Sequence, residues 1–302
     1  MRNRGGPPPG PPAATTIYSP DHAIDLKFAL MGIKTVMRRD GVHWWSTTTP
    51  SGPASMAFRE ASGQVKADSW GPGAAWAIEQ LPMLLGANDT TAIEFRPQHR
   101  VVQELLDQFS SIRIGASGRW YEALATGAIG QRVVAVDAAR SRVQLARRHG
   151  DGSIGGPAPL FPTPEQLLGL NDQDFHRVGI ERSRARVLRV AAKYAERLEQ
   201  LDEVPGAAAD EWLRRLPGIG PWTAGLTTAA AGGDPDAVPV GDLHIPRLVT
   251  LALCGEAGND DRMLELLEPF KGHRQRVVRL VELAGAEPSD RPAPFRYDIS
   301  EI

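Results

Sequence analysis

The stretch from Leu216 to Ala224 constrains the fold of this 302-residue chain more than any other. Two glycines, Gly218 and Gly220, stand one residue apart between an amphipathic run and a run rich in Ala, Leu and Thr. Glycine permits positive φ and close backbone approach, so a sharp reversal is expected here. Pro221 suits the first turn of a helix, where its missing N–H leaves no bond unmade. The stretch therefore predicts two helices joined by a tight hairpin.

The second helix of the hairpin would begin with free backbone amides. The first N–H groups of a helix have no partner within it, and the helix dipole adds partial positive charge at that end. Such an end is suited to an anion, for example a phosphate of a nucleic-acid backbone.

The distribution of charge points to the same kind of ligand in one region. The net charge of −2 argues against a chain that is basic throughout. Residues 131–193, however, hold ten Arg and one Lys against six Asp or Glu, whereas residues 196–270 hold five Arg against fourteen Asp or Glu. If DNA binds, the middle of the chain should supply most of the charge for phosphates, and the hairpin should contribute amides. The alternative is that these arginines belong to solvated helix faces.

The single cysteine, Cys254, excludes an internal disulfide, a cysteine-ligated zinc site and a four-cysteine iron–sulfur cluster. Because it lies in an apolar run, we expect its thiol to be buried and to serve packing. No apolar run is long enough to span a bilayer, and the N-terminus lacks the apolar segment of a signal peptide. We therefore expect a cytoplasmic, nucleoid-associated protein with no membrane contact.

Four segments are expected along the chain. Residues 1–15, rich in Pro and Gly, predict a disordered tail; residues 16–95, a small α+β domain; residues 96–290, an all-helical body; and residues 291–302, a C-terminal tail. The N-terminal domain predicts strands at 16–18, 42–48, 54–60 and 64–70 and helices at 21–37 and 74–85. Its Trp44, Trp45 and Trp70 are expected in the core rather than on a ligand surface. The body predicts helices at 99–112, 118–126, 131–149, 164–168, 173–178, 182–201, 208–216, 221–231, 243–254, 260–267 and 274–284.

An aspartate at a fixed distance narrows the interpretation of the hairpin. Asp242 stands 24 positions after Gly218, at the end of a Val-Pro-Val-Gly approach and at the head of another expected helix. Here the sequence resembles the helix–hairpin–helix DNA glycosylase superfamily, in which a catalytic Asp follows the hairpin at about this distance. The hairpin looks most like that of the alkylation-repair branch, the bacterial 3-methyladenine DNA glycosylase II group. Residues 128–133 and 161–164 are similar to further stretches of that branch.

The resemblance covers about residues 16–286 and implies a mainly α fold, a helical glycosylase body preceded by a small α+β domain. It implies a monomer that binds double-stranded DNA with a damaged base and acts in base excision repair. No cofactor is required, although the hairpin carbonyls, which map to Leu216 and Ile219, bind a monovalent cation (Na⁺ or K⁺) in this family.

The chemistry of the bond explains the need for Asp242. Breaking an N-glycosidic bond develops positive charge on the sugar, which an ionised carboxylate near C1′ stabilises while it orients water. An alkylated purine already carries positive charge and leaves readily, so one carboxylate can suffice. The alternative role is that Asp242 only caps the following helix.

Trp222 separates the branches of the superfamily. In the glycosylase/lyase branches this position carries a Lys nucleophile that forms a Schiff base. Tryptophan cannot do so, and the resemblance therefore implies a monofunctional enzyme. The indole offers its face to a cationic base, a contact of about 0.5–2 kcal/mol, or else packs the hairpin. Leu226 and Glu282 stand where the best-known member of the family has aromatic residues in its base pocket. Glu282 could attract a cationic base or donate a proton to it, although we expect this side chain to lie on the solvated surface.

The resemblance also assigns DNA contacts. Gly218, Ile219 and Gly220 would offer amides to a phosphate and Thr223 a hydroxyl. Arg132, after Gln131, stands where the family inserts a usually apolar wedge into the gap left by the flipped base, so it inserts there or holds a phosphate.

The sequence therefore predicts a monofunctional DNA N-glycosylase that excises alkylated purines such as 3-methyladenine. Two alternatives stay open. One is a glycosylase of the same fold for hypoxanthine or an oxidised base. The other is a non-catalytic DNA-binding or damage-sensing module.

Overall fold

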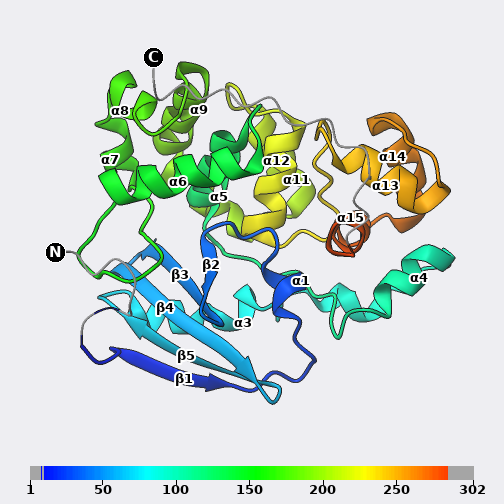
Figure 1. Ribbon diagram of the computed structural model, residues 1–302, viewed down its shortest axis with the longest axis horizontal. Coiled ribbons are helices and arrows are strands. Elements are labelled where there is room, and N and C mark those ends of the chain that lie inside the picture. Colours follow the sequence, from blue (N-terminus) through cyan, green and yellow to red (C-terminus); the bar gives the residue numbers. More distant parts are fainter. Residues whose placement is uncertain (1–7, 9, 285–302) are drawn as a thin grey trace.

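A five-stranded antiparallel sheet and a larger helical body make up the computed structural model, which describes residues 8 and 10–284 (Figure 1). The sheet has the strand order β1-β5-β4-β3-β2. The strands are β1 (Ala14–Tyr18), β2 (Val36–Arg39), β3 (Val42–Thr49), β4 (Gly52–Ala61) and β5 (Gln64–Trp70).

Helices supply the rest of the described chain. Those before the body are α1 (Leu26–Leu30), α2 (Ala74–Glu79), α3 (Leu81–Leu84) and the short turn η1 (Thr90–Glu94). The body contains α4 (Arg100–Leu106), α5 (Trp120–Gly130), α6 (Ala135–His149), α7 (Pro164–Leu168), α8 (Asp172–His176), α9 (Arg182–Lys193), α10 (Ala195–Glu199), η2 (Gln200–Glu203), α11 (Gly206–Arg214), α12 (Pro221–Thr227), η3 (Thr228–Gly232), α13 (Ile245–Cys254), α14 (Asp260–Leu267), η4 (Glu268–Phe270) and α15 (Arg274–Leu283). Among the described residues, no helix has both the length and the apolar character to cross a membrane.

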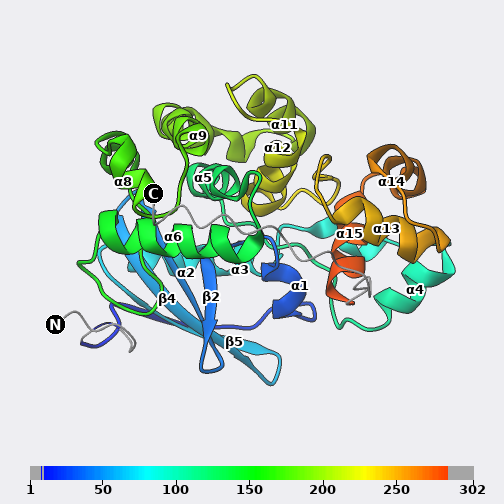
Figure 2. The ribbon, with the colours of Figure 1, turned by 45° about the horizontal axis from the view of Figure 1, so that its top comes forward.

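Three apolar clusters organise these elements. In the sheet, Met56 and Phe58 alternate along β4. They pack with Trp45 of β3 and with Leu81 and Leu84 of α3. In the body, α5 lies at the centre and contacts α6, α9, α10 and α12. Figure 2 shows α5 among α6, α9 and α12. The third cluster joins α4, α13, α14 and α15 and includes Phe28 from α1. The tryptophan prediction is confirmed for Trp44 and Trp45, which are buried.

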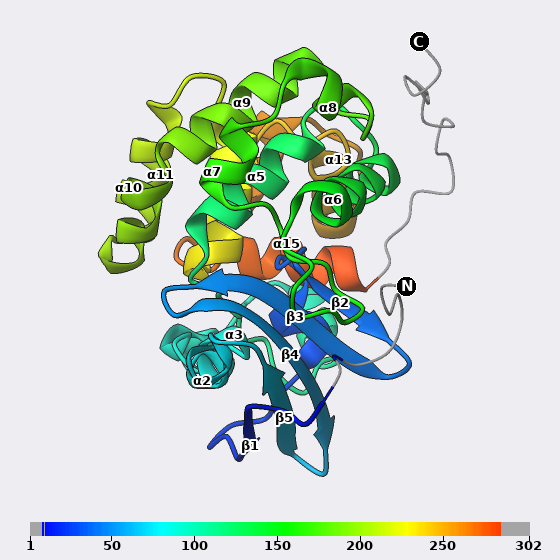
Figure 3. The same cartoon turned by 90° about the vertical axis from the view of Figure 1, so that its left-hand side faces the viewer.

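Helix α15 connects the two parts of the protein; in Figure 3 it lies between the sheet and the helices α5, α6 and α13. Its Arg276 is fully buried and forms a bidentate ion pair with Asp89, at 2.6 and 3.0 Å. Its Arg279 is equally buried and donates from Nη1 to the carbonyls of Phe28 and Ala29 in α1. A buried charge is costly unless it is paired and hydrogen-bonded, so the Arg276–Asp89 pair fixes α15 against the N-terminal segment. Arg279 has only the two carbonyl partners, and its Nε and Nη2 are buried without one.

Several boundaries differ from the prediction. The helix expected at 21–37 is wrong: only α1 is helical, and β2 pairs with β3 instead. Arg279 binds carbonyls of α1, a contact between residues about 250 positions apart that no local pattern reveals. The helix expected at 131–149 begins at Ala135, because Arg132 has φ +57° in the preceding turn. The helix expected at 182–201 is divided into α9, α10 and η2.

The ends of the chain and the cysteine also differ. Strand β1 starts at Ala14, within the segment predicted as a disordered tail, and the Trp70 indole donates to the Gly10 carbonyl. Most of that tail (residues 1–7 and 9) and the predicted C-terminal tail (residues 291–302) lie outside the described residues. Cys254 is exposed rather than buried, because it is the last residue of α13.

Candidate active site

The hairpin between α11 and α12 has the conformation that its sequence predicts. Gly218 adopts φ +82°, and a Cβ atom there would lie 2.7 Å from Cγ2 of Val187 on α9. Gly220 has an ordinary backbone conformation, and a Cβ there would meet nothing within 4 Å. Glycine is therefore required at Gly218 by both conformation and space, whereas Gly220 leaves open space in front of the first turn of α12. Ile219 is buried and anchors the hairpin in the core of the body.

Gln131 connects the end of α5 to this hairpin. Its Nε2 donates to the Gly218 carbonyl and to Oγ1 of Thr223, both at 3.0 Å. Thr223 is only 2% exposed, so in the free protein its hydroxyl serves this contact. The next residue, Arg132, is exposed and has φ +57°, an unusual conformation for a residue with a side chain. The turn therefore presents the Arg132 side chain to solvent beside the hairpin.

Asp242 is held by three N–H donors. Its Oδ1 accepts from the amides of His244 (2.8 Å) and Ile245 (3.0 Å), and its Oδ2 accepts from Nε1 of Trp222 at 2.7 Å. The first two bonds place the carboxylate at the N-terminus of α13, where negative charge is favoured. The bond from Trp222 joins the carboxylate to the hairpin itself. The Asp242 side chain therefore caps α13 and is oriented by the hairpin at the same time.

The approach loop to Asp242 packs closely on α12. A Cβ atom at Gly225 would lie 2.7 Å from the Val238 carbonyl oxygen, so only glycine lets the loop come this near. Gly241 adopts φ +93°, and its amide donates to Asp260 Oδ1 at 2.9 Å. The two glycines and Asp260 thus set the position of Asp242 relative to Trp222.

The two residues that depart from the family pattern lie near this site. Leu226 is half-buried, one turn after Trp222 on α12. Glu282 on α15 is also half-buried rather than on the solvated surface that the sequence favoured. Burial raises the pKa of Glu282; the charge of Lys34 opposes this shift, and the charge of Asp242 reinforces it. Glu282 is therefore an electrostatic neighbour of Asp242.

Comparisons with known proteins bear on the fold. No protein-family model and no curated protein sequence gives a significant match to this chain. Among solved structures, a 3-methyladenine DNA glycosylase from Archaeoglobus fulgidus is similar with a TM-score of 0.73 and 20% identity, over 89% of this chain and 97% of that chain. An 8-oxoguanine glycosylase/lyase from Clostridium acetobutylicum is similar with a TM-score of 0.69 and 14% identity, over 90% of this chain and 97% of that chain. A 3-methyladenine DNA glycosylase from Schizosaccharomyces pombe, solved with abasic DNA, is similar with a TM-score of 0.54 and 18% identity, over 66% of this chain and 99% of that chain.

The chain has the helix–hairpin–helix DNA glycosylase fold. This result confirms the predicted fold class, a helical body preceded by a small α+β unit. The similar structures include enzymes named for 3-methyladenine and for 8-oxoguanine, so the likeness does not separate the branches.

The glycosylase fold places the predicted cation ligands in one turn. The Leu216 carbonyl accepts the Ile219 amide at 3.1 Å, and the Gly218 carbonyl is bound by Gln131. Carbonyl oxygens are suitable ligands for Na⁺ or K⁺, so the turn fits such an ion, and the site stays a prediction. Within the described part of the chain, no group of three or more His, Cys, Asp or Glu side chains could hold a metal.

Only part of the basic middle region is available for phosphates. Arg182 and Arg189 pair with Asp172, and Arg184 is buried, where it donates to the carbonyls of Ile129 and Gly179. Within residues 131–193, the exposed arginines that form no ion pair with another described residue are Arg132, Arg147, Arg148 and Arg186. The phosphate interpretation therefore stays a prediction, limited to these four arginines, while the paired and buried arginines serve the protein itself.

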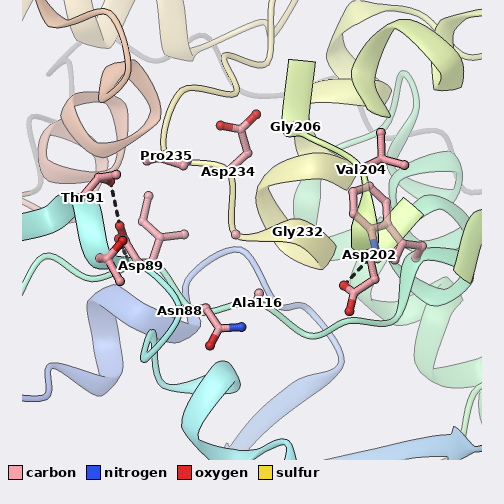
Figure 4. Close-up of a pocket in the computed structure, with 14 residues that line it drawn as sticks. Asn88, Asp89, Thr91, Ala116, Asp202, Val204, Gly206, Gly232, Asp234 and Pro235 are labelled. Carbon is pink, nitrogen blue, oxygen red and sulfur yellow. Dashed lines mark hydrogen bonds between the residues drawn. The ribbon is translucent and has the colours of Figure 1, made fainter. Parts of the chain in front are cut away.

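A cavity of about 230 Å³ lies elsewhere (Figure 4). Asp89, Asp202, Gly232 and Asp234 are among the residues that line it, and none of Trp222, Leu226 and Asp242 is. Two of its carboxylates are occupied, since Asp89 binds Arg276 and Asp202 accepts from the Trp120 indole at 3.3 Å. The cavity is therefore separate from the candidate active site.

Sequence reasoning missed Gly225, Asp260 and the bond between Trp222 and Asp242. Gly225 carried a signal, because a glycine inside a helical run commonly marks close packing. Asp260 and the indole bond carried none, since they depend on how distant segments meet.

Proposed function

We propose that this protein is a monofunctional DNA N-glycosylase that flips alkylated purines such as 3-methyladenine out of duplex DNA and excises them by hydrolysis. The observation that carries the proposal is the hydrogen bond from Trp222 Nε1 to Asp242 Oδ2, which aligns a carboxylate with a phosphate-binding hairpin. A plain helix cap needs only the amides of the helix. The third donor supports a carboxylate that is held in place for chemistry.

The geometry supports the following sequence of events. The amides of Gly218, Gly220 and the first turn of α12 bind a backbone phosphate, whereas the Ile219 amide, expected to join them, is already bound to the Leu216 carbonyl. Arg132 contacts the DNA beside this phosphate. The damaged nucleotide rotates out of the helix and brings its C1′ atom near Asp242. The carboxylate stabilises the positive charge that develops on the sugar as the glycosidic bond breaks. Water then adds to C1′ and leaves an abasic site.

The identity of residue 222 supports hydrolysis without strand cleavage. Tryptophan has no amine to form a Schiff base with the sugar, so the DNA strand should stay intact until alkali is added. The half-buried indole is placed to contact a flipped base and Asp242 together. We further propose that the protein acts as a monomer, with a monovalent cation at the Leu216 and Ile219 carbonyls.

Release of bases from methylated duplex DNA, with mass analysis of the products, tests this proposal. Asp242→Asn keeps the shape of the side chain and should bind a duplex with an abasic-site analogue normally while it loses excision. Undiminished release by Asp242→Asn would refute the mechanism. DNA binding without any release by the native protein would favour the non-catalytic alternative.

A further inference from the structure

The indole ring of Trp222 is held at its rim. Its Nε1 donates to Asp242 Oδ2 on the approach loop at 2.7 Å. At the far end of the six-membered ring, Cη2 would lie 3.2 Å from a Cβ atom placed on Gly130, the last residue of α5. The third point is Cβ of Trp222, which joins the ring to α12. Because three points define the plane of the ring, a displacement of Cη2 tilts the indole and moves Nε1 as well.

The faces of this ring have no aromatic or cationic partner in the protein. Trp222 is half-buried, and it lies outside the three apolar clusters that the described residues form. In the same part of the chain, no aromatic ring stacks on it and no guanidinium lies over it. The contacts at the rim therefore carry more of the positioning of this indole.

The absence of a side chain at Gly130 has one identifiable use. Gly130 is helical and has no positive φ, so its backbone conformation suits any residue. Glycine within a helix is less stable than alanine, so its presence calls for a reason. Apart from its chain neighbours and its own helix, Cη2 of Trp222 is the only described atom within 4 Å of an added Cβ. The space at Gly130 is therefore space for the indole.

The same end of α5 also holds the backbone of the hairpin. Gln131, the residue after Gly130, donates to the Gly218 carbonyl and to Oγ1 of Thr223, both at 3.0 Å. Two consecutive residues thus contact the hairpin in different ways, one through a hydrogen bond and one through the room that it leaves. The end of α5 is therefore a common reference for the hairpin and for the ring of Trp222.

We propose that Gly130 is a positioning residue of the candidate active site, which sets the tilt of the Trp222 indole and, through Nε1, the orientation of the Asp242 carboxylate. The inference rests on the proposed glycosylase function and adds a residue to its site. Since 3.2 Å is shorter than the ordinary contact distance of 3.4 Å, a methyl group at position 130 displaces the rim of the ring by a few tenths of an ångström. The carboxylate moves with the indole that binds it.

Gly130→Ala, alone and combined with Trp222→Phe, tests the proposal in single-turnover excision from methylated duplex DNA. A phenyl ring is shorter than an indole and has no atom in the place of Cη2, so the added methyl group has no ring to displace. We expect Gly130→Ala to slow excision by about three- to tenfold in the native background. In the Trp222→Phe background the further loss should be less than about twofold, because the two residues act as a pair.

Binding and stability show whether the loss has another cause. Alanine favours a helix more than glycine does, so thermal unfolding of Gly130→Ala should stay near that of the native protein. Binding to a duplex with an abasic-site analogue should also stay near native, because the hydrogen bonds of Gln131 to the hairpin are retained. The expected effect is thus on the rate of excision at saturating DNA.

Gly127→Ala is the matched control on the same helix. Its added Cβ atom would lie 3.3 Å from Cγ2 of Thr223, which is nearly the same clearance, and none of its three nearest atoms belongs to Trp222. Whatever loss of excision Gly127→Ala causes should therefore be the same in the native and the Trp222→Phe backgrounds.

The Nε1–H resonance of Trp222 reports the position of the ring without any need for activity. The chain has seven tryptophans, and the indole cross-peak that is missing from the ¹H–¹⁵N spectrum of Trp222→Phe identifies this one. Gly130→Ala should shift that cross-peak more than Gly127→Ala does, because it changes the hydrogen bond to Asp242.

Three results would overturn the proposal: undiminished excision by Gly130→Ala, the same loss in both backgrounds, or a Trp222 cross-peak that moves no more than in Gly127→Ala. A native protein that binds DNA but releases no base would refute the proposed function instead, and the cross-peak would still decide whether Gly130 positions the indole.

Discussion

Gly225→Ala is the substitution whose effect the structure predicts most directly. The added Cβ atom would lie 2.7 Å from the Val238 carbonyl oxygen, 3.1 Å from the Val238 carbonyl carbon and 3.3 Å from Cα of Pro239. All three are backbone atoms, so no flexible side chain can move aside. Ordinary contact begins near 3.4 Å, and the loop must therefore retreat by about 0.7 Å, at a cost of about 1–3 kcal/mol.

The retreat should matter because the same loop carries Asp242. The bond from Trp222 Nε1 to Asp242 Oδ2 is 2.7 Å long and would stretch, moving the carboxylate away from the sugar. A displacement of about 1 Å can slow an enzyme by about 10²-fold. We expect Gly225→Ala to excise bases tens of times more slowly in single-turnover assays while it binds an abasic-site duplex almost normally.

Gly169→Ala is the matched control. Its backbone has φ −73°, and its added Cβ atom would meet nothing closer than 3.4 Å. It should leave excision unchanged and alter the free energy of unfolding by less than about 1 kcal/mol. The reasoning fails if Gly225→Ala loses stability as expected but excises bases within twofold of the native rate, because Asp242 would then tolerate movement of its loop.

Four further predictions follow from the contacts described above. Trp222→Phe keeps an aromatic ring but removes the donor to Asp242 Oδ2; it should slow excision about tenfold without weakening binding to abasic DNA, and equal rates would show that the indole N–H is dispensable. Gln131→Ala frees the hairpin from α5, so DNA titrations should show weaker binding, while excision at saturating DNA stays near native. Arg276→Met leaves the buried carboxylate of Asp89 without its partner and should lower the free energy of unfolding by about 3–5 kcal/mol in urea titrations; Asp89→Asn in the same chain should recover part of the loss. Burial raises the pKa of Glu122 above its ordinary value of 4.5, so the native protein should lose stability as pH rises from 4.5 through the folded-state pKa; Glu122→Gln should remove this loss in melting curves recorded at increasing pH.

The parts of the site that sequence could predict are those fixed by local rules. The Gly218 turn, the start of α12 at Pro221 and the distance to Asp242 follow from the conformational limits of glycine and proline and from spacing. Strands β3 to β5 were also predicted nearly to their ends, since alternation and turn residues bound them. These features need no knowledge of distant segments.

The parts that could not be predicted depend on contacts across the chain. The carbonyls of α1 are bound by Arg279, and the charge of Asp242 acts on Glu282 from a loop about 40 residues earlier in the chain. Arg132 ends the preceding turn in a left-handed conformation that its residue type does not signal. Sequence therefore identified the carboxylate and the hairpin, but it placed the second carboxyl group on the surface.

The anchoring of α15 joins the N-terminal segment to the helix that carries Glu282. Asp89, Phe28 and Ala29 come before the helical body, yet they bind the two buried arginines of the helix that carries Glu282. Gly32 belongs to the same segment, and a Cβ atom there would lie 3.8 Å from Cα of Ala230 in η3, the helical turn that follows α12. A substitution that loosens α1 should therefore disturb α15 before it changes whether DNA is bound, because the hairpin that we propose binds the DNA backbone is held separately, by Gln131 and the core of the body.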